Sequence, residues 1–562
     1  MTSPRTASPS SNEEKFGELR EKLGDAFVSQ KEVDTGAELA AGYVGELDPA
    51  EALRIRRKID KHIMPLMCSK FQILYFRQTR RDTQRSNPIQ SPLLFMDKTT
   101  LGSAAILGIR SDSSDYKPIQ LVIGFTLQQL PSRSIKTSNR LGTIFYLSYL
   151  AFEFPQNLCL QKFPVAKWMS LNITIWAIAL CAHAACKNFA GLFVVRLILG
   201  ACEGSITAGF MIVTSMFYTR NEQTVRVGYW FLMNGTAQII AGFISFGTLH
   251  IRTSSFEPWQ WLMIITGILT LLTALAFWFL FPDSPTTAWF LTMDERAKAI
   301  RRIKENQTGV ENKQFKKEQM VEALLDPKTW LFALFSALDN VPNSLTNQRQ
   351  IIVASFGFTV LQTTLLSCVD GIIEIVTIWV GVTIASRIPN SRAYVGTIFM
   401  IPNLLGVFLI NFLPWSNKVG LLFSEWLTGV GTTGFVLALS WLSSVTAGHT
   451  KKVTVNAIML SAYCIGNAAG PFMWQAQYKP RNHVPWIIIG VCYLACMFLL
   501  LLLRFIMDKE NKRRDTETRD TTYDEVYIER ASSDGSSIEK VRVDKEFLDL
   551  TDIQNRDFRY VL

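Results

Sequence analysis

The chain has 562 residues, of which 48% are hydrophobic and only 19% are charged. Soluble domains carry about 25% charged residues, so this composition excludes an ordinary soluble protein and indicates an all-α polytopic membrane protein. The formal net charge is +10 at pH 7. Because the positive charges are concentrated outside the apolar segments, we interpret them as a topology signal and expect no nucleic-acid partner.

The sequence offers little for catalysis or for metal binding. Its nine cysteines include no CxxC pair, and several lie in apolar runs, so we interpret them as packing residues. It contains no glycine-rich phosphate loop, no cluster of metal ligands and no nucleophile beside a base. We therefore expect neither an enzyme nor an ATP-driven mechanism, and no cofactor and no metal.

The N-terminal part of the chain predicts a tail, a helix and a disrupted span. Residues 1–50 are polar and lack periodicity, which predicts a disordered cytoplasmic tail. Residues 49–61 predict a short basic amphipathic helix. The apolar run that follows is interrupted by four arginines between Arg77 and Arg85. Each would cost about 2.5–3.5 kcal/mol in the hydrocarbon core, so we expect this segment to loop out at a membrane face.

From residue 141 onward, apolar stretches of spanning length recur regularly. With the disrupted first span they make twelve, six on each side of a long basic loop that the positive-inside rule places in the cytoplasm together with both termini. The expected spans are 141–161, 168–187, 189–217, 227–249, 259–281, 329–353, 364–386, 393–414, 419–443, 453–475 and 484–507.

This pattern divides the chain into two bundles, a linker and two tails. We expect an N-terminal six-helix bundle over residues 51–282, with atypical insertions at about 70–94 and 115–140. A cytoplasmic linker over 283–327 leads to a C-terminal six-helix bundle over 328–507. Residues 508–562 are charged and polar, which predicts a cytoplasmic tail that is mostly disordered.

The span 189–217 carries two charges, Arg196 and Glu203. Seven residues make almost two helical turns, so the two side chains share one face about 10 Å apart along the axis. Ionisable groups inside a membrane point to function by default, so the pair indicates an ion pathway. The alternative is a structural charge pair with partners on neighbouring helices. Gly200, Gly204 and Gly209 lie near the same face, where small residues allow close helix packing.

The second half carries further polar groups inside its spans. Around Asp339, several amides and Pro342 predict either a cavity-lining discontinuous helix or a kinked gating helix without substrate contact. Asp370, Glu374 and Glu425 are the other acids in these spans, and the last two we interpret as paired or close to helix ends. In the first half, Glu153 is a further acid, either a third proton carrier or, the interpretation we favour, a structural residue near a helix end. Gly466 and Gly470 predict packing in the eleventh span.

Five local motifs stand out, which begin at Met96 (MDKTTLG), Gly142 (GTIFYLSYLAFEFPQN), Arg196 (RLILGACEG), Asp339 (DNVPNSLTNQ) and Tyr463 (YCIGNAAGP). They resemble the fungal allantoate permease family of the anion:cation symporters, within the major facilitator superfamily. The resemblance runs from about Asp48 to Ile506. It implies the major facilitator fold, and proton-coupled uptake of a small organic anion across the plasma membrane: allantoate, ureidosuccinate, nicotinate or a similar carboxylate.

The resemblance also implies a set of site residues. Asp97 and Lys98 match the family's acidic-basic pair at the end of the first span, and Arg196 and Glu203 match its arginine and acid of the fourth span. The family's cavity tyrosines correspond to Tyr146 or Tyr149, and its polar pair of the eleventh span corresponds to Tyr463 and Asn467. To these we add Asn343, an amide of the seventh span. The substrate-binding candidates are Arg196, Lys98, Tyr146, Tyr149, Asn343, Tyr463 and Asn467, and the proton-coupling candidates are Glu203 and Asp97.

The chemistry of these residue types fits a symporter. Arginine stays cationic and binds a carboxylate through two hydrogen bonds, whereas a buried carboxyl can alternate between its neutral and ionised forms. The family has one continuous first helix, while here about twenty extra residues precede the Asp97–Lys98 pair, as translated introns or as lineage insertions. Two alternatives therefore remain: a sensor that binds the same anion without transporting it, and an inactive product of a mispredicted gene. The fold can work as a monomer in the lipid bilayer.

Overall fold

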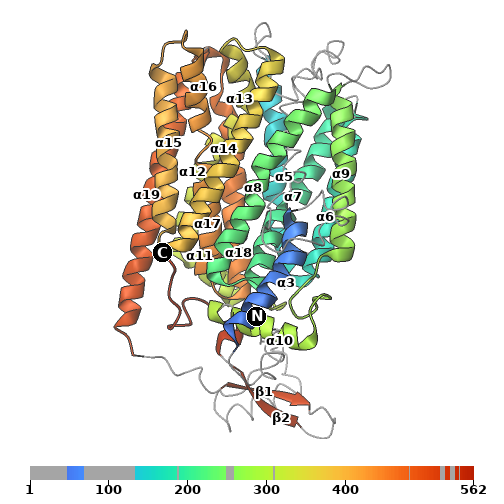
Figure 1. The fold of residues 1–562 in the computed structure, drawn as a ribbon, viewed down its shortest axis with the longest axis vertical. Helices are drawn as coiled ribbons and strands as arrows, with labels where there is room; N and C mark the ends of the chain where they lie inside the picture. The colour runs from blue at the N-terminus through green and yellow to red at the C-terminus, as the bar shows by residue number, and fades with distance from the viewer. Residues whose placement is uncertain are drawn as a thin grey trace, which may run out of the picture.

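The computed structural model describes residue 34 and most of the chain from residue 47 onward. The described ranges are 47–68, 133–186, 189–248, 258–307, 311–479, 481–518, 526–531, 538–543 and 545–562. The expected insertion at 70–94, the Asp97–Lys98 pair and the first part of the insertion at 115–140 lie outside them. The described helices of the first half, in blue to green, and those of the second half, in yellow to red, lie side by side (Figure 1).

The described part of the first half contains the amphipathic helix α3 and a set of long apolar helices. α5 begins at Arg133, earlier than the predicted residue 141, so the end of the second atypical stretch continues directly into a span. The predicted basic helix is present and extends through Pro65. These helices are α3 (Pro49–Cys68), α5 (Arg133–Lys162), α6 (Val165–His183), α7 (Phe189–Phe217), α8 (Arg220–Thr248) and α9 (Pro258–Leu280).

The linker between the halves is partly helical rather than a plain polar loop. It contains α10 (Met293–Ile303), the 3-10 turn η1 (Lys304–Asn306) and α11 (Lys317–Leu325). The Thr292 hydroxyl accepts a hydrogen bond from the Glu295 amide, which caps the start of α10. Ion pairs join α10 to α3, including Lys298–Glu51 at 2.6 Å.

In the second half, two of the predicted spans are broken. The span 329–353 stops at Asn340 and resumes at Leu345, because Pro342 has no amide hydrogen to donate to the helix. The span 419–443 is divided by a turn over residues 428–431. The elements are α12 (Pro327–Asn340), η2 (Pro342–Ser344), α13 (Leu345–Ser355), α14 (Val360–Arg387), α15 (Arg392–Phe412), α16 (Lys418–Leu427), α17 (Thr432–Val445), α18 (His449–Ala469), η3 (Gly470–Met473), η4 (Ala476–Tyr478) and α19 (His483–Asp515).

Length and apolar composition allow eight helical segments of the described chain to span a membrane. Glycines set the closest helix contacts among them. A Cβ at Gly200 of α7 would collide with the Phe145 carbonyl of α5, and one at Gly466 of α18 would collide with the Ala337 carbonyl of α12. These positions confirm that the small residues of the fourth and eleventh spans serve close packing.

The prediction of a mostly disordered C-terminal tail is wrong for residues 545–562, which we call the C-terminal segment. After the antiparallel strands β1 (Val526–Ala531) and β2 (Ile538–Val543), η5 (Lys545–Phe547) opens this segment. Phe547 and Phe558 are 2% and 0% exposed. The Trp441 indole donates to the Val561 carbonyl at 2.6 Å, so the segment packs against α17. Its polar composition suggested disorder, but its charges are neutralised by the helices on which it lies.

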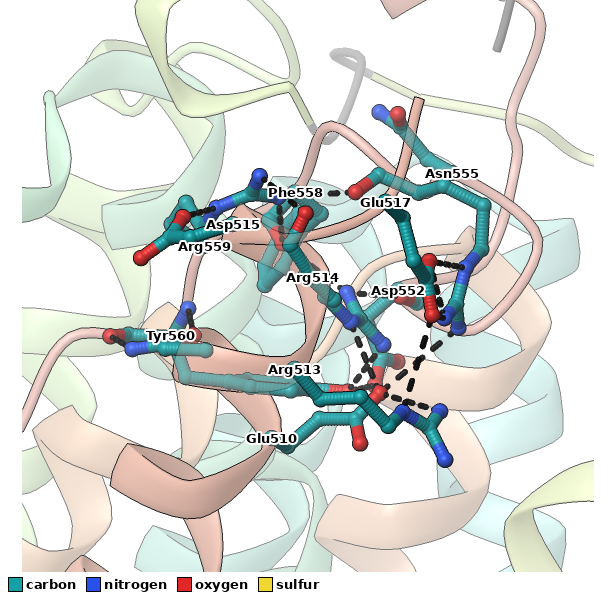
Figure 2. Close-up of polar contacts among 12 residues, drawn as sticks. Glu510, Arg513, Arg514, Asp515, Glu517, Asp552, Asn555, Phe558, Arg559 and Tyr560 are labelled. Atoms are coloured by element: carbon teal, nitrogen blue, oxygen red, sulfur yellow. Dashed lines mark hydrogen bonds and ion pairs between the residues drawn. The ribbon is translucent and has the colours of Figure 1, made fainter. Parts of the chain in front are cut away.

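Arg514, near the end of α19, lies at the centre of these contacts (Figure 2). Its guanidinium donates to the carbonyls of Phe558 and Asp552 at 2.8 and 2.9 Å. The neighbouring Arg559 pairs with Asp515 at 2.8 Å. The segment also reaches the first half of the chain, because the Arg220 guanidinium at the start of α8 stacks 4.0 Å from the centre of the Phe558 ring.

Candidate functional site

The two intramembrane charges of the fourth span lie on one uninterrupted helix, α7. The Glu203 side chain is buried, with 4% of the residue exposed. Arg196 is partly buried, and His183 of α6 lies within its electrostatic reach. Arg196 therefore has an ionisable side chain of a neighbouring helix close to it.

Glu153 of α5 is the acid whose position differs from the prediction. It lies about two and a half turns before the end of the helix and is 0% exposed, so it is not a helix-end residue. Asn157 donates to its Oε1 at 2.7 Å, while its Oε2 accepts no hydrogen bond within the described part of the chain. That oxygen lies against Gly204 of α7, and Glu203 interacts with it electrostatically. Two carboxyl groups thus share the α5–α7 contact.

Three predicted tyrosines meet where the first and second halves of the chain come together. Tyr149 of α5 is 1% exposed and packs on Gly204. The ring of Tyr463 from α18 lies 6.1 Å from that of Tyr149 and 6.4 Å from that of Tyr146. Aromatic rings at this spacing form favourable contacts, and their hydroxyls add polar groups to the same region.

The predicted amides are brought together in the second half. Asn343, in the η2 turn, donates to the Asn467 side chain of α18 at 2.7 Å. Asn467 in turn donates to the Asn340 side chain at 3.1 Å and to the Tyr463 carbonyl at 2.9 Å. The break in the seventh span therefore places an amide chain beside the tyrosines. This arrangement confirms that the seventh span is discontinuous.

Sequence reasoning missed Arg349 of α13, although it is a lone cation in an apolar span. Its Nη1 lies 2.6 Å from Asp370 of α14, and its Nε lies 3.3 Å from Glu425 of α16. Glu374, one turn after Asp370, accepts hydrogen bonds at 2.6 Å from Asn234 and Gln238 of α8. Glu425 is therefore paired with a cation, as predicted, whereas Glu374 is hydrogen-bonded to two side-chain amides. The argument that singled out Arg196, a charge inside a membrane span, applies equally to Arg349.

The described side chains thus form two polar regions within the helices. One combines the α7 charges, the α5 acid and the tyrosines at the contact of the two halves. The other is the buried Arg349 cluster of the second half. Among the residues that the structure describes, no group of three or more His, Cys, Asp or Glu side chains is placed to hold a metal ion. Both regions bring ionisable and hydrogen-bonding groups together within the helices.

Comparison with known proteins identifies the class. Residues 93–471 match the model of the Major Facilitator Superfamily, and the chain belongs to that superfamily. It is a multi-pass membrane transporter and not an enzyme. The xylose transporter XylE from E. coli, in a partially occluded inward-open conformation, is similar in fold. A second structure, of the proton:xylose symporter XylE with a bound glucose derivative, superposes with a TM-score of 0.52 at 12% identity, covering 74% of this chain and 95% of XylE.

Relatives in Saccharomyces cerevisiae give the closer context. The thiamine pathway transporter THI73 is 32% identical, with 97% of this chain and 92% of the relative covered. The allantoate permease is 30% identical, covering 95% and 91%. The high affinity cysteine transporter is also 30% identical, covering 84% and 87%. Similarity to the allantoate permease agrees with the family resemblance of the motifs.

Proposed function

We propose that this protein is a plasma-membrane symporter that couples the uptake of a small organic anion to protons. The observation that carries this proposal is the position of Arg196 and Glu203 on one helix, α7, with Glu203 buried beside a second acid. A cation and an acid on the same helix can bind an anion and a proton in one region. The allantoate permease among the relatives supports allantoate, ureidosuccinate, nicotinate or a similar carboxylate as the substrate.

The two residues divide the labour according to their chemistry. Arg196 holds the substrate carboxylate, because its planar guanidinium stays charged and offers two parallel donors. Glu203 carries the proton, since a buried carboxyl can exist in both forms. A proton on Glu203 removes a competing negative charge, which leaves Arg196 freer to bind the incoming anion. Asp97 shares the proton role and Lys98 adds positive potential.

The remaining candidates shape the anion site. Tyr146, Tyr149 and Tyr463 offer hydroxyl donors, while Asn343 and Asn467 offer amides from the broken seventh span and from α18. The two bundles, 51–282 and 328–507, rock about this region as a monomer, with a pseudo-two-fold axis along the membrane normal. The linker and both termini lie in the cytoplasm.

Uptake into vesicles tests the proposal. Purified full-length protein is reconstituted and labelled allantoate is supplied with an inward proton gradient, with nicotinate and ureidosuccinate as competitors. We expect accumulation by the wild type, severe loss of binding in Arg196→Lys because the fork is lost, and exchange without gradient-driven accumulation in Glu203→Gln. The control is Glu318→Gln, an exposed acid of α11, which should behave like the wild type.

Two outcomes would redirect the assignment. Full proton-driven accumulation by Glu203→Gln would move the proton site to Asp97 or Glu153. Normal affinity in Arg196→Ala would move the anion site to Lys98 or to the amides around Asn343. Binding without accumulation by the wild type would instead indicate a sensor. Transcript sequencing across codons 70 to 140 tests whether the two atypical stretches are translated.

A further inference from the structure

The Arg349 cluster lies outside the proposed anion site and contains more acids than bases. Arg349 contacts Asp370 at 2.6 Å and Glu425 at 3.3 Å. The side chains of Asp370 and Glu425 are 8% and 0% exposed. Arg349, Asp370 and Glu425 come from α13, α14 and α16, respectively. The tertiary fold therefore assembles the cluster from separate segments.

The charge balance of this cluster is unfavourable when every acid is ionised. Arg349 supplies one positive charge, while Asp370, Glu425 and the adjacent Glu374 would supply three negative charges. Among the described residues, Tyr493 of α19 and Cys368 of α14 are the other titratable groups that interact with these side chains, and neither adds a positive charge. An uncompensated buried charge is strongly unfavourable. A proton bound by one carboxyl would relieve part of this cost.

The contacts distinguish the three acids. Asp370 makes the short charge-assisted contact with Arg349, which favours its ionised form. Both oxygens of Glu374 accept amide hydrogen bonds from α8, and such donors also favour a carboxylate. Glu425 has only the longer contact with the Arg349 Nε, at 3.3 Å, and neither of its oxygens accepts a hydrogen bond within the described residues. Of the three, Glu425 is therefore the carboxyl least stabilised as an anion.

We propose that Glu425 is a proton-binding site of the second bundle. Its carboxyl group is protonated and deprotonated beside the permanent Arg349–Asp370 ion pair. The proton comes from water and returns to it, and its binding forms one O–H bond on Glu425 while Arg349 remains paired with Asp370. This site is separate from Glu203. It stands whether or not an anion is carried with protons, and thus goes beyond the proposed function.

Infrared difference spectroscopy of the full-length protein in lipid nanodiscs tests the assignment. Spectra at neutral and alkaline pH are subtracted, and the carbonyl stretch of protonated buried carboxyls is resolved into components. We expect Glu425→Gln to lose one component that the wild type shows. Glu374→Gln and the exposed Glu318→Gln should keep it. Glu203→Gln should remove a different component, so failure of the proposed symport mechanism is recognised separately.

A second variant tests the charge balance with Glu425 still present. In Asp370→Asn the guanidinium of Arg349 has Glu425 as its remaining close acid, so the two form a neutral pair and the Glu425 carboxyl should become ionised. The same carbonyl component should therefore disappear. Its persistence in Glu425→Gln, or its loss in Glu374→Gln, would overturn the proposal. Survival of the carbonyl component in Asp370→Asn would also overturn the proposal. The Asp370→Asn variant therefore provides a test even if Glu425→Gln does not fold.

Discussion

Replacing Asp552 by asparagine should release the C-terminal segment from the helices. Asp552 is 0% exposed. Its carboxylate contacts the Lys328 ammonium at 2.7 Å and the Lys451 ammonium at 2.8 Å, and it accepts a hydrogen bond from the Tyr560 hydroxyl at 2.7 Å. The Asp552→Asn substitution would keep the shape of the side chain but remove the charge that balances the buried Lys451 and the half-buried Lys328.

The loss of docking free energy depends on the acidic partners that the lysines retain. Breaking a buried ion pair costs about 3–5 kcal/mol. Lys451 retains Glu322 at 2.9 Å and Asp326 at 3.1 Å, so we expect the lower end, about 3 kcal/mol. This free energy concerns the docking of residues 545–562 rather than global unfolding. It corresponds to roughly a hundredfold faster amide exchange in the segment.

Hydrogen–deuterium exchange of the full-length protein, read by mass spectrometry, measures this directly. The matched control is Asp557→Asn on the same segment. Asp557 pairs with Lys545, and its side chain is 29% exposed, so its removal should cost less than about 1 kcal/mol. If Asp552→Asn exchanged no faster than Asp557→Asn, the buried ion pairs would not be what holds the segment, and the packing of its aromatic residues would have to carry the docking.

Three further outcomes are expected. Burial alone would raise the pKa of Asp552, but the Lys328 and Lys451 ammonium groups outweigh burial and lower that pKa. The contribution of Asp552 to segment docking is therefore complete above the pKa of an unfolded aspartate, about 3.9. It is lost only as the pH falls below that value. Protection of the segment should not change through this carboxyl between neutral and mildly acidic pH, and a loss there would contradict the assignment. Gly466→Ala should lower thermal stability by about 1–3 kcal/mol, because the new Cβ meets the Ala337 carbonyl; an unchanged melting temperature would show that the helices separate easily. Trp441→Phe removes the hydrogen bond to Val561 and should weaken segment docking by about 1 kcal/mol, measured by the same exchange experiment, in which an unchanged rate would show that this bond does not contribute.

The sequence predicted those features that depend on neighbouring residues. Apolar stretches of spanning length became helices because backbone groups in a membrane must bond within the helix. The break at Pro342 was predictable because proline lacks an amide hydrogen. Arg196 and Glu203 could be assigned to one helix from their spacing alone. In contrast, the burial of Glu153 against Gly204 depends on how α5 meets α7, which spacing along one helix does not reveal.

The C-terminal segment shows why composition failed at one end of the chain. A charged, polar stretch resembles a disordered tail because it lacks apolar area to bury. Here its partners lie far away in the sequence. Lys328 is in the first turn of α12 and Lys451 is in the first turn of α18, and both are more than a hundred positions before Asp552. The acids that contact Arg349 are nearer in the sequence, but they lie on two other helices, α14 and α16. A charge pattern therefore predicts that partners exist, while only the fold identifies them, and this holds equally for Asp552 and for Arg349.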